Sequence, residues 1–129
     1  MGPLDEAGVG PHNPSVSWDK LRAISAIAAA DLAVLVAEWE QPGTYDQPRY
    51  SEARHKCQER MVYHLERLRR VKQPERATAA EAEQFLQLVA KLDAAMDWEP
   101  RGPRFCRLRL DELEALADDL RASGGGRHD

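Results

Sequence analysis

The stretch "ISAIAAADLAVLVA", residues 24–37, decides the fold of this chain, because it is apolar on more than one side of a helix. One face repeats at helical spacing and contains Leu21, Ile24, Ala28, Leu32, Leu35 and Trp39. Ile27 and Val34 lie off that face, and an alanine-rich strip covers the back. A helix that is apolar nearly all round needs neighbours on several sides. We therefore expect a central helix of the monomer, or a homo-oligomer interface formed by Ile27, Val34 and the alanine-rich face.

Four helices are expected, and capping residues, prolines and glycines set their bounds. The first covers residues 16–40, with Ser15 or Ser17 as its N-cap and "QPG" at its end. The second covers residues 50–72. The third begins with the capping box Thr78–Glu81, in which each side chain satisfies the other residue's free amide. The fourth is short, residues 111–122, and needs packing against the others to form.

These helices predict an all-α antiparallel bundle of three long helices plus one shorter C-terminal helix. The second helix buries a stripe around Met61 and Leu68, and the third repeats apolar residues from Phe85 to Met96 at heptad spacing. The bundle is expected to be one domain, residues 17–122. Glycines and prolines predict a flexible arm over residues 1–16 and a disordered glycine-rich tail over residues 123–129.

The composition narrows the class of protein. The two cysteines, Cys57 and Cys106, are too few for a disulfide framework and form no Cys-x-x-Cys pair. The most apolar run is fourteen residues long and is interrupted by Asp31, whereas a membrane span needs about twenty. The acidic start of the chain does not resemble a secretory signal. We expect a cytoplasmic protein that does not enter a membrane.

Charge divides the chain into three parts, although the total is only −4. Residues 1–48 carry seven acids and two bases, and residues 77–129 carry eleven acids and seven bases. Residues 49–76, which contain the second helix, carry nine bases and four acids. Helical spacing gathers its bases and one tyrosine into a stripe beside the buried face: Lys56, Arg60, Tyr63, Arg67 and Arg70.

Three interpretations of this basic stripe remain open from the sequence. It is a solvated face paired with acidic helices of the same bundle, a surface for an acidic protein partner, or a row of cations that contacts nucleic-acid phosphates. A second basic patch, "EPRGPRFCRLR" at residues 99–109, is expected to be an arginine-rich loop. It contains Arg101, Arg104, Phe105, Arg107 and Arg109. Its alternative role is to tie the fourth helix to acidic neighbours, with Phe105 and Leu108 tucked into the bundle.

Catalytic and metal chemistry find little support in the sequence. Glu52 and His55 form a Glu-x-x-His, but a helical di-metal site needs a second one and further glutamates. Cys57 and His64 share the buried side of the second helix, where a thiol is usually inert and two ligands cannot complete a zinc site. We expect His64 at the boundary, hydrogen-bonded to a neighbour. Asp31 is expected as a partly exposed carboxylate paired with Arg or Lys, and neither catalytic residues nor a cofactor is expected.

The sequence therefore predicts a non-enzymatic helical protein-interaction module that acts through the basic face of its second helix. An adaptor, a regulatory protein or a small subunit of a larger assembly fits this description. The alternative is a small helical subunit that contacts the phosphate backbone of nucleic acid without reading bases. Its acidic total argues against the alternative, because dedicated nucleic-acid-binding domains are usually basic.

Overall fold

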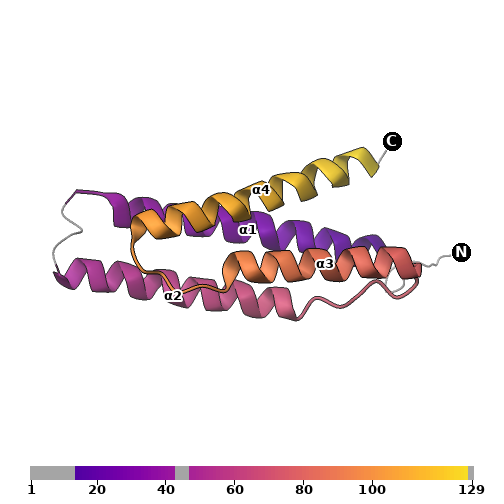
Figure 1. Cartoon of the computed structure of the whole chain (residues 1–129), viewed down its shortest axis with the longest axis horizontal. Helices are drawn as coiled ribbons and strands as arrows, with labels where there is room; N and C mark the ends of the chain where they lie inside the picture. The colour runs from indigo at the N-terminus through magenta and orange to yellow at the C-terminus, as the bar shows by residue number, and fades with distance from the viewer. Residues whose placement is uncertain (1–13, 43–46, 128–129) are drawn as a thin grey trace, which may run out of the picture.

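The computed structural model describes residues 14–42 and 47–127, and their backbone forms four helices. These are α1 (Pro14–Glu40), α2 (Gln47–Arg69), α3 (Ala79–Met96) and α4 (Pro103–Arg127). Successive helices run in opposite directions along the long axis of the molecule (Figure 1). The predicted all-α antiparallel bundle is confirmed.

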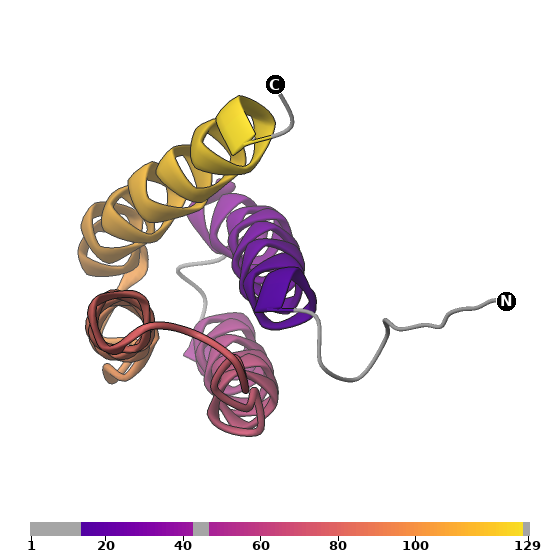
Figure 2. The same ribbon diagram turned by 90° about the vertical axis from the view of Figure 1, so that its right-hand side faces the viewer.

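Viewed end-on, α1 lies between α2 and α4, and α3 closes the opposite side (Figure 2). Leu21, Leu32 and Trp39 of α1 are each no more than 1% exposed. They form one core with Met61 and Leu68 of α2 and with these residues of the last two helices: Phe85, Leu92, Met96, Leu110 and Leu113. The expected core face of each helix is therefore the buried face.

The capping box at the start of α3 is present as predicted. The backbone N–H of Glu81 donates to Oγ1 of Thr78, and the backbone N–H of Thr78 donates to Oε1 of Glu81. Each side chain satisfies an amide that the first turn of a helix leaves without an intrahelical partner. The other helix starts were less accurate: α1 begins at Pro14, so Ser15 and Ser17 lie inside it and neither is its N-cap.

The expectation of a short fourth helix was wrong. α4 has 25 residues, begins at Pro103 rather than Asp111 and extends past Ala122 to Arg127. Proline at the first helical position needs no backbone N–H and has the right φ, so "GP" at residues 102–103 starts a helix. At the other end, residues 123–127, which the sequence had assigned to a disordered tail, prolong a helix that already exists and needs no new nucleus.

The expected flexible arm, residues 1–16, lies largely outside the described residues. Only Pro14 and the two residues after it are described, and their backbone belongs to α1. Within the described part of the chain, no helix is long and apolar enough to cross a membrane.

Candidate protein-interaction surface

The predicted basic stripe of α2 lies along the outer side of the α1–α2 contact. Tyr63 is at its centre and is 46% exposed. The guanidinium carbons of Arg60 and Arg67 lie 5.2 Å and 5.8 Å from the centroid of the Tyr63 ring, and a nitrogen of Arg67 donates to the tyrosine hydroxyl at 3.4 Å. Cations over an aromatic face are attracted to its electrons. The three side chains therefore form one ordered patch on the surface.

One acid of α1 reaches into this stripe. Nε of Arg60 donates to Oδ2 of Asp31 at 2.8 Å, and Nε2 of His64 lies 2.7 Å from the same oxygen. Partial burial raises the pKa of the Asp31 carboxyl, but the hydrogen bonds from His64 and Arg60 outweigh it and leave that pKa below its usual value. The predicted pairing of Asp31 is confirmed. His64 is more buried than a boundary residue, with 1% exposed, so this cluster ties α2 to α1.

The end of the stripe nearest the start of α1 has a different character. Lys20 of α1 meets Arg67 and Arg70 of α2 around a hollow of about 260 Å³. Its remaining lining is mainly apolar and comes from Ala23, Ile24 and Val71. Among the described residues, none of the three cations has a carboxylate within ion-pair distance. This site concentrates uncompensated positive charge beside apolar surface.

The sequence did not assign Lys20 to this site. Lys20 joins the stripe only because α1 and α2 run antiparallel and bring the start of one helix beside the end of the other. A sequence signal did exist, since Lys20 is seven residues before Ile27 and fourteen before Val34. All three positions therefore lie on the same side of α1.

The other end of the stripe is less basic. Lys56 lines a hollow of about 200 Å³ at the α1–α2 contact. The charged residues around this hollow are two bases, Arg49 and Lys56, and two acids, Glu38 and Glu52. The lining residues are Leu35, Glu38, Arg49, Glu52, Ala53 and Lys56. The predicted stripe is continuous along α2, but its charge is uncompensated mainly at the Lys20 end.

The outer face of α1 is exposed and apolar beside this stripe. Ile27 is 47% exposed and Val34 is 58% exposed. Ala23, Ala30 and Ala37 repeat at heptad spacing on the same side of the helix. The residues of this apolar outer face are Ala23, Ala26, Ile27, Ala30, Ala33, Val34 and Ala37. Asp31 lies only at its margin, facing α2. In the monomer α1 thus packs against α2 and α4 with one face, and none of the other described helices covers its second apolar face.

The second predicted patch is divided between different roles, because residues 103–109 form the first turns of α4 and only residues 99–102, with Arg101, belong to the connection before it. Arg107 donates to Oε1 of Glu40 at 3.0 Å and so ties α4 to α1. Arg101 lies over the ring of Phe105 at 5.3 Å, and that ring contacts Trp98 edge-on. Arg104 is exposed. The alternative structural role suits Arg107 and Phe105, but Leu108 is 64% exposed and not tucked into the bundle.

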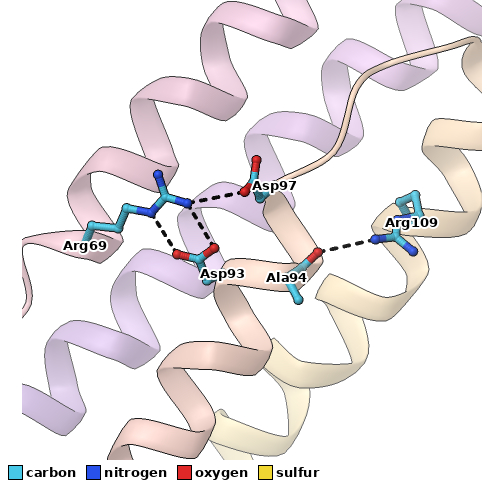
Figure 3. A network of polar contacts seen from close by, with 5 residues as sticks. All are labelled: Arg69, Asp93, Ala94, Asp97 and Arg109. Atoms are coloured by element: carbon cyan, nitrogen blue, oxygen red, sulfur yellow. Dashed lines mark hydrogen bonds and ion pairs between the residues drawn. The ribbon is translucent and has the colours of Figure 1, made fainter.

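Arg109 and Arg69 also bind within the molecule (Figure 3). Arg69 makes a two-pronged contact with Asp93, at 2.8 Å and 3.0 Å, and reaches Asp97 at 3.4 Å. Arg109 donates to the carbonyl oxygen of Ala94 at 3.3 Å. These bonds join α2 and α4 to the C-terminal half of α3. The arginines on this side of the bundle therefore have internal structural partners.

Both cysteines are buried, and among the described histidines His64 is buried and His55 is exposed. Cys57 and Cys106 are almost fully buried, and burial raises their thiol pKa values to about 12 and about 11. Such thiols stay protonated and are poor nucleophiles. His55 and Glu59 point into solvent, as expected, and lie 3.3 Å apart. Across the described ranges, no group of three or more His, Cys, Asp or Glu side chains could hold a metal ion.

Comparison with known proteins gives no match to a family model, a curated protein or a solved structure. The function must therefore be argued from the surface itself.

Proposed function

We propose that the protein is a non-enzymatic helical interaction module that binds an acidic protein surface. The basic stripe of α2 and Lys20 of α1 bind the partner's carboxylates, and the apolar outer face of α1 covers its apolar side chains. Adaptor, regulatory and small-subunit roles all use a surface of this kind. The module acts by bringing its partner to a defined face of a rigid bundle.

The observation that supports this proposal is the hollow between Lys20, Arg67 and Arg70. Most cations with a defined contact elsewhere in the described bundle pair with a carboxylate, as Arg69 does with Asp93 and Arg107 with Glu40. Lys20, Arg67 and Arg70 instead surround apolar surface and have no carboxylate partner among the described residues. Charges that face each other across an interface speed association and fix its orientation, while apolar contact at its centre supplies most of the affinity.

The same observation favours protein over nucleic acid. A phosphate backbone offers anions but little apolar surface, so it would leave Ile27 and Val34 uncovered. The nucleic-acid alternative is kept as an outcome of the experiment below.

Binding to synthetic probes tests the proposal. The probes are an amphipathic helical peptide with glutamates beside a leucine face, the same peptide with lysines, and a single-stranded oligonucleotide. Fluorescence anisotropy at two salt concentrations should show that the acidic peptide binds best and stays bound when salt is raised. Arg67→Glu with Arg70→Glu should weaken its binding at least about tenfold, because two attractive contacts become repulsive.

The matched control reverses two exposed bases outside the stripe, Arg54→Glu with Lys72→Glu, which changes the net charge equally. This control should bind the acidic peptide like the unchanged protein at the higher salt. Equal losses in both double variants would show only a general charge effect and would refute the proposed site. Tight oligonucleotide binding with a steep salt dependence would replace the proposal with the nucleic-acid alternative.

A further inference from the structure

An acidic stripe of α4 flanks the apolar outer face of α1 on the side opposite to α2. The ion pair of Arg107 with Glu40 identifies the side of α4 that faces the outer edge of α1. Asp111, Glu114 and Asp118 follow Arg107 at intervals of four, seven and eleven residues, so they share that side of the helix. The hydrogen bond to Glu40 raises the pKa of Arg107, and the charges of Glu114 and Asp111 raise it further.

The uncovered face of α1 therefore lies between unlike charges. In the end-on view, α2 and α4 lie on either side of α1 (Figure 2). The sequence of α2 includes Lys56, Arg60 and Arg67, and that of α4 includes Asp111, Glu114 and Asp118. The face between them, from Ala23 to Ala37, is about 21 Å long at the rise of an α-helix. A partner for this face needs an apolar helix that has acidic residues on the side facing α2 and basic residues on the side facing α4.

A second copy of the chain has these features. We propose that two molecules pair through the outer faces of α1, with the two α1 helices parallel and related by a twofold axis along them. This inference rests on the proposed function and identifies the acidic partner of the basic stripe as the α4 stripe of another copy.

The charge pattern selects the parallel arrangement. A twofold axis along α1 brings α2 of each copy beside α4 of the other, so that basic stripe faces acidic stripe on both sides. An axis perpendicular to α1 would make the two helices antiparallel and would bring α2 beside α2 and α4 beside α4. Like charges would then meet along both sides of the interface, which is unfavourable.

The levels of the charges along α1 agree with this arrangement. Arg60 lies opposite Asp31, so Lys56, one turn earlier on an antiparallel helix, is level with about residue 35 of α1. Arg107 lies opposite Glu40, so Asp111 is level with about residue 36. A parallel twofold pairing keeps each residue at its own level, so Lys56 of one copy faces Asp111 of the other. Glu114 comes to lie near the level of Arg60 in the same way.

The apolar outer face of α1 is too small to form a stable interface by itself, so the basic and acidic stripes must contribute buried area as well. A stable interface buries roughly 800 Å² of each partner. Five of the seven residues on the apolar outer face are alanines, and alanines contribute little area each. They do let two helix backbones approach closely, which brings α2 of one copy toward α4 of the other.

Sedimentation equilibrium from micromolar to millimolar protein tests whether the pair forms. The unchanged chain should be a dimer at the higher concentrations, and Val34→Glu should raise the dissociation constant at least about 100-fold by placing a charge twice in an apolar contact. Leu86→Glu is the matched control, since Leu86 is 48% exposed and lies on α3, on the opposite side of the bundle. The control should dimerise normally, and circular dichroism should show that both variants remain folded.

A charge exchange tests the proposed pairing of stripes. Lys56→Glu with Arg67→Glu removes the net positive charge of the basic stripe and places two acids opposite the acidic stripe, and Asp111→Lys with Glu114→Lys reverses the net charge of the acidic stripe. Each variant alone should dimerise at least about tenfold more weakly than the unchanged chain, but an equimolar mixture should form a heterodimer. A mixture that stays monomeric while the unchanged chain dimerises would refute this pairing.

Cysteine cross-linking determines the orientation. In a parallel pair, Ala23→Cys alone should form a disulfide-linked dimer, and so should Ala37→Cys alone. In an antiparallel pair, only a mixture of the two variants would cross-link, and that result would overturn the inference. The buried native thiols do not compete. A chain that stays monomeric at millimolar concentration would also overturn the inference, whereas the proposed function is decided separately by peptide binding to Arg67 and Arg70.

Discussion

Arg67 and Arg69 are two residues apart on α2 but face opposite sides of the bundle. Arg69 faces α3, where it binds both oxygens of Asp93 and reaches Asp97 (Figure 3). Arg67 faces the outer side of α1, where its contacts are the ring and hydroxyl of Tyr63 and the hollow shared with Lys20 and Arg70. The α2–α3 side is thus closed by internal pairs, and the α1–α2 side is left open.

The difference shows which surface is available for a partner. On the closed side, carboxylates of α3 satisfy the arginines, and apolar residues such as Phe85 and Leu92 are buried. On the open side, exposed apolar residues lie next to exposed cations that have no carboxylate within ion-pair distance among the described residues. A lone exposed valine or arginine is ordinary, but an extended apolar face beside unpaired charge is typical of an interaction surface.

The largest effect on stability should come from truncating a side chain on the buried face of α1, and the same kind of truncation on its outer face is the comparison. Leu32 is 1% exposed, so Leu32→Ala should lower the free energy of unfolding by about 3 kcal/mol through lost burial and a cavity. Val34, two residues later, is 58% exposed, and Val34→Ala should change that free energy by less than about 0.5 kcal/mol in the monomer. Urea unfolding at low protein concentration measures both. A comparable loss for Val34→Ala would mean that the outer face is already covered within the monomer.

An intermediate effect is expected at Asp31, which pairs with Arg60 of the stripe on the open side. Asp31→Asn at neutral pH should lower the free energy of unfolding by about 1 to 3 kcal/mol, because the buried imidazole of His64 loses a charged hydrogen-bond partner. The pKa of Asp31 is lowered in the folded state, so its stabilising contribution is complete above the ordinary carboxyl value and is lost as the pH falls through the lower, folded pKa.

The pH dependence sharpens this test. The difference between the unchanged chain and the Asn variant should be constant from neutral pH down to about pH 4.5 and should shrink below about pH 4. Urea unfolding at a series of pH values follows it. A difference that grows as the pH falls through this range would contradict the role given to the ionised carboxylate.

The smallest effect on stability is expected for substitutions of Arg67 and Arg69, and it should differ between these two arginines. Arg69→Gln should lower the urea midpoint measurably, because it removes contacts to two carboxylates of α3. Arg67→Gln should leave the midpoint nearly unchanged, since Arg67 has no carboxylate partner among the described residues. Equal shifts in the two midpoints would show that the open side contributes as much to the fold as the closed side, and the comparison would fail.

Much of the fold could be predicted from local sequence signals. The capping box of Thr78 and Glu81 fixed the start of α3, because both bonds form within four consecutive residues. The apolar stripes of α2 and α3 also predicted their buried faces. The start of α4 was missed because residues 99–109 were expected to form an arginine-rich loop. Cys106, Leu110, Leu113, Ala117 and Leu120, which repeat at heptad spacing behind Pro103, carried the better signal.

The candidate site could be predicted only in part. Helical periodicity was enough to gather Lys56, Arg60, Tyr63, Arg67 and Arg70 on one side of α2. It could not tell that Asp31 binds Arg60, that Arg107 pairs with Glu40, or that Lys20 completes the hollow. Each of these contacts joins different helices, so it depends on how far one helix is rotated and shifted against the next.

The sequence by itself determined that four helices form, which faces of them are buried and that positive charge is concentrated on α2, because these follow from periodicity and from neighbours three or four residues apart. Only the tertiary structure decided which charges are neutralised and which apolar face is left uncovered. Ion pairing between helices has a range of a few ångströms, so the packing of the helices decides that Arg69 meets Asp93, whereas Arg67 has no carboxylate within that range among the described residues. The open side of the bundle is therefore a property of the packed molecule rather than of any single segment.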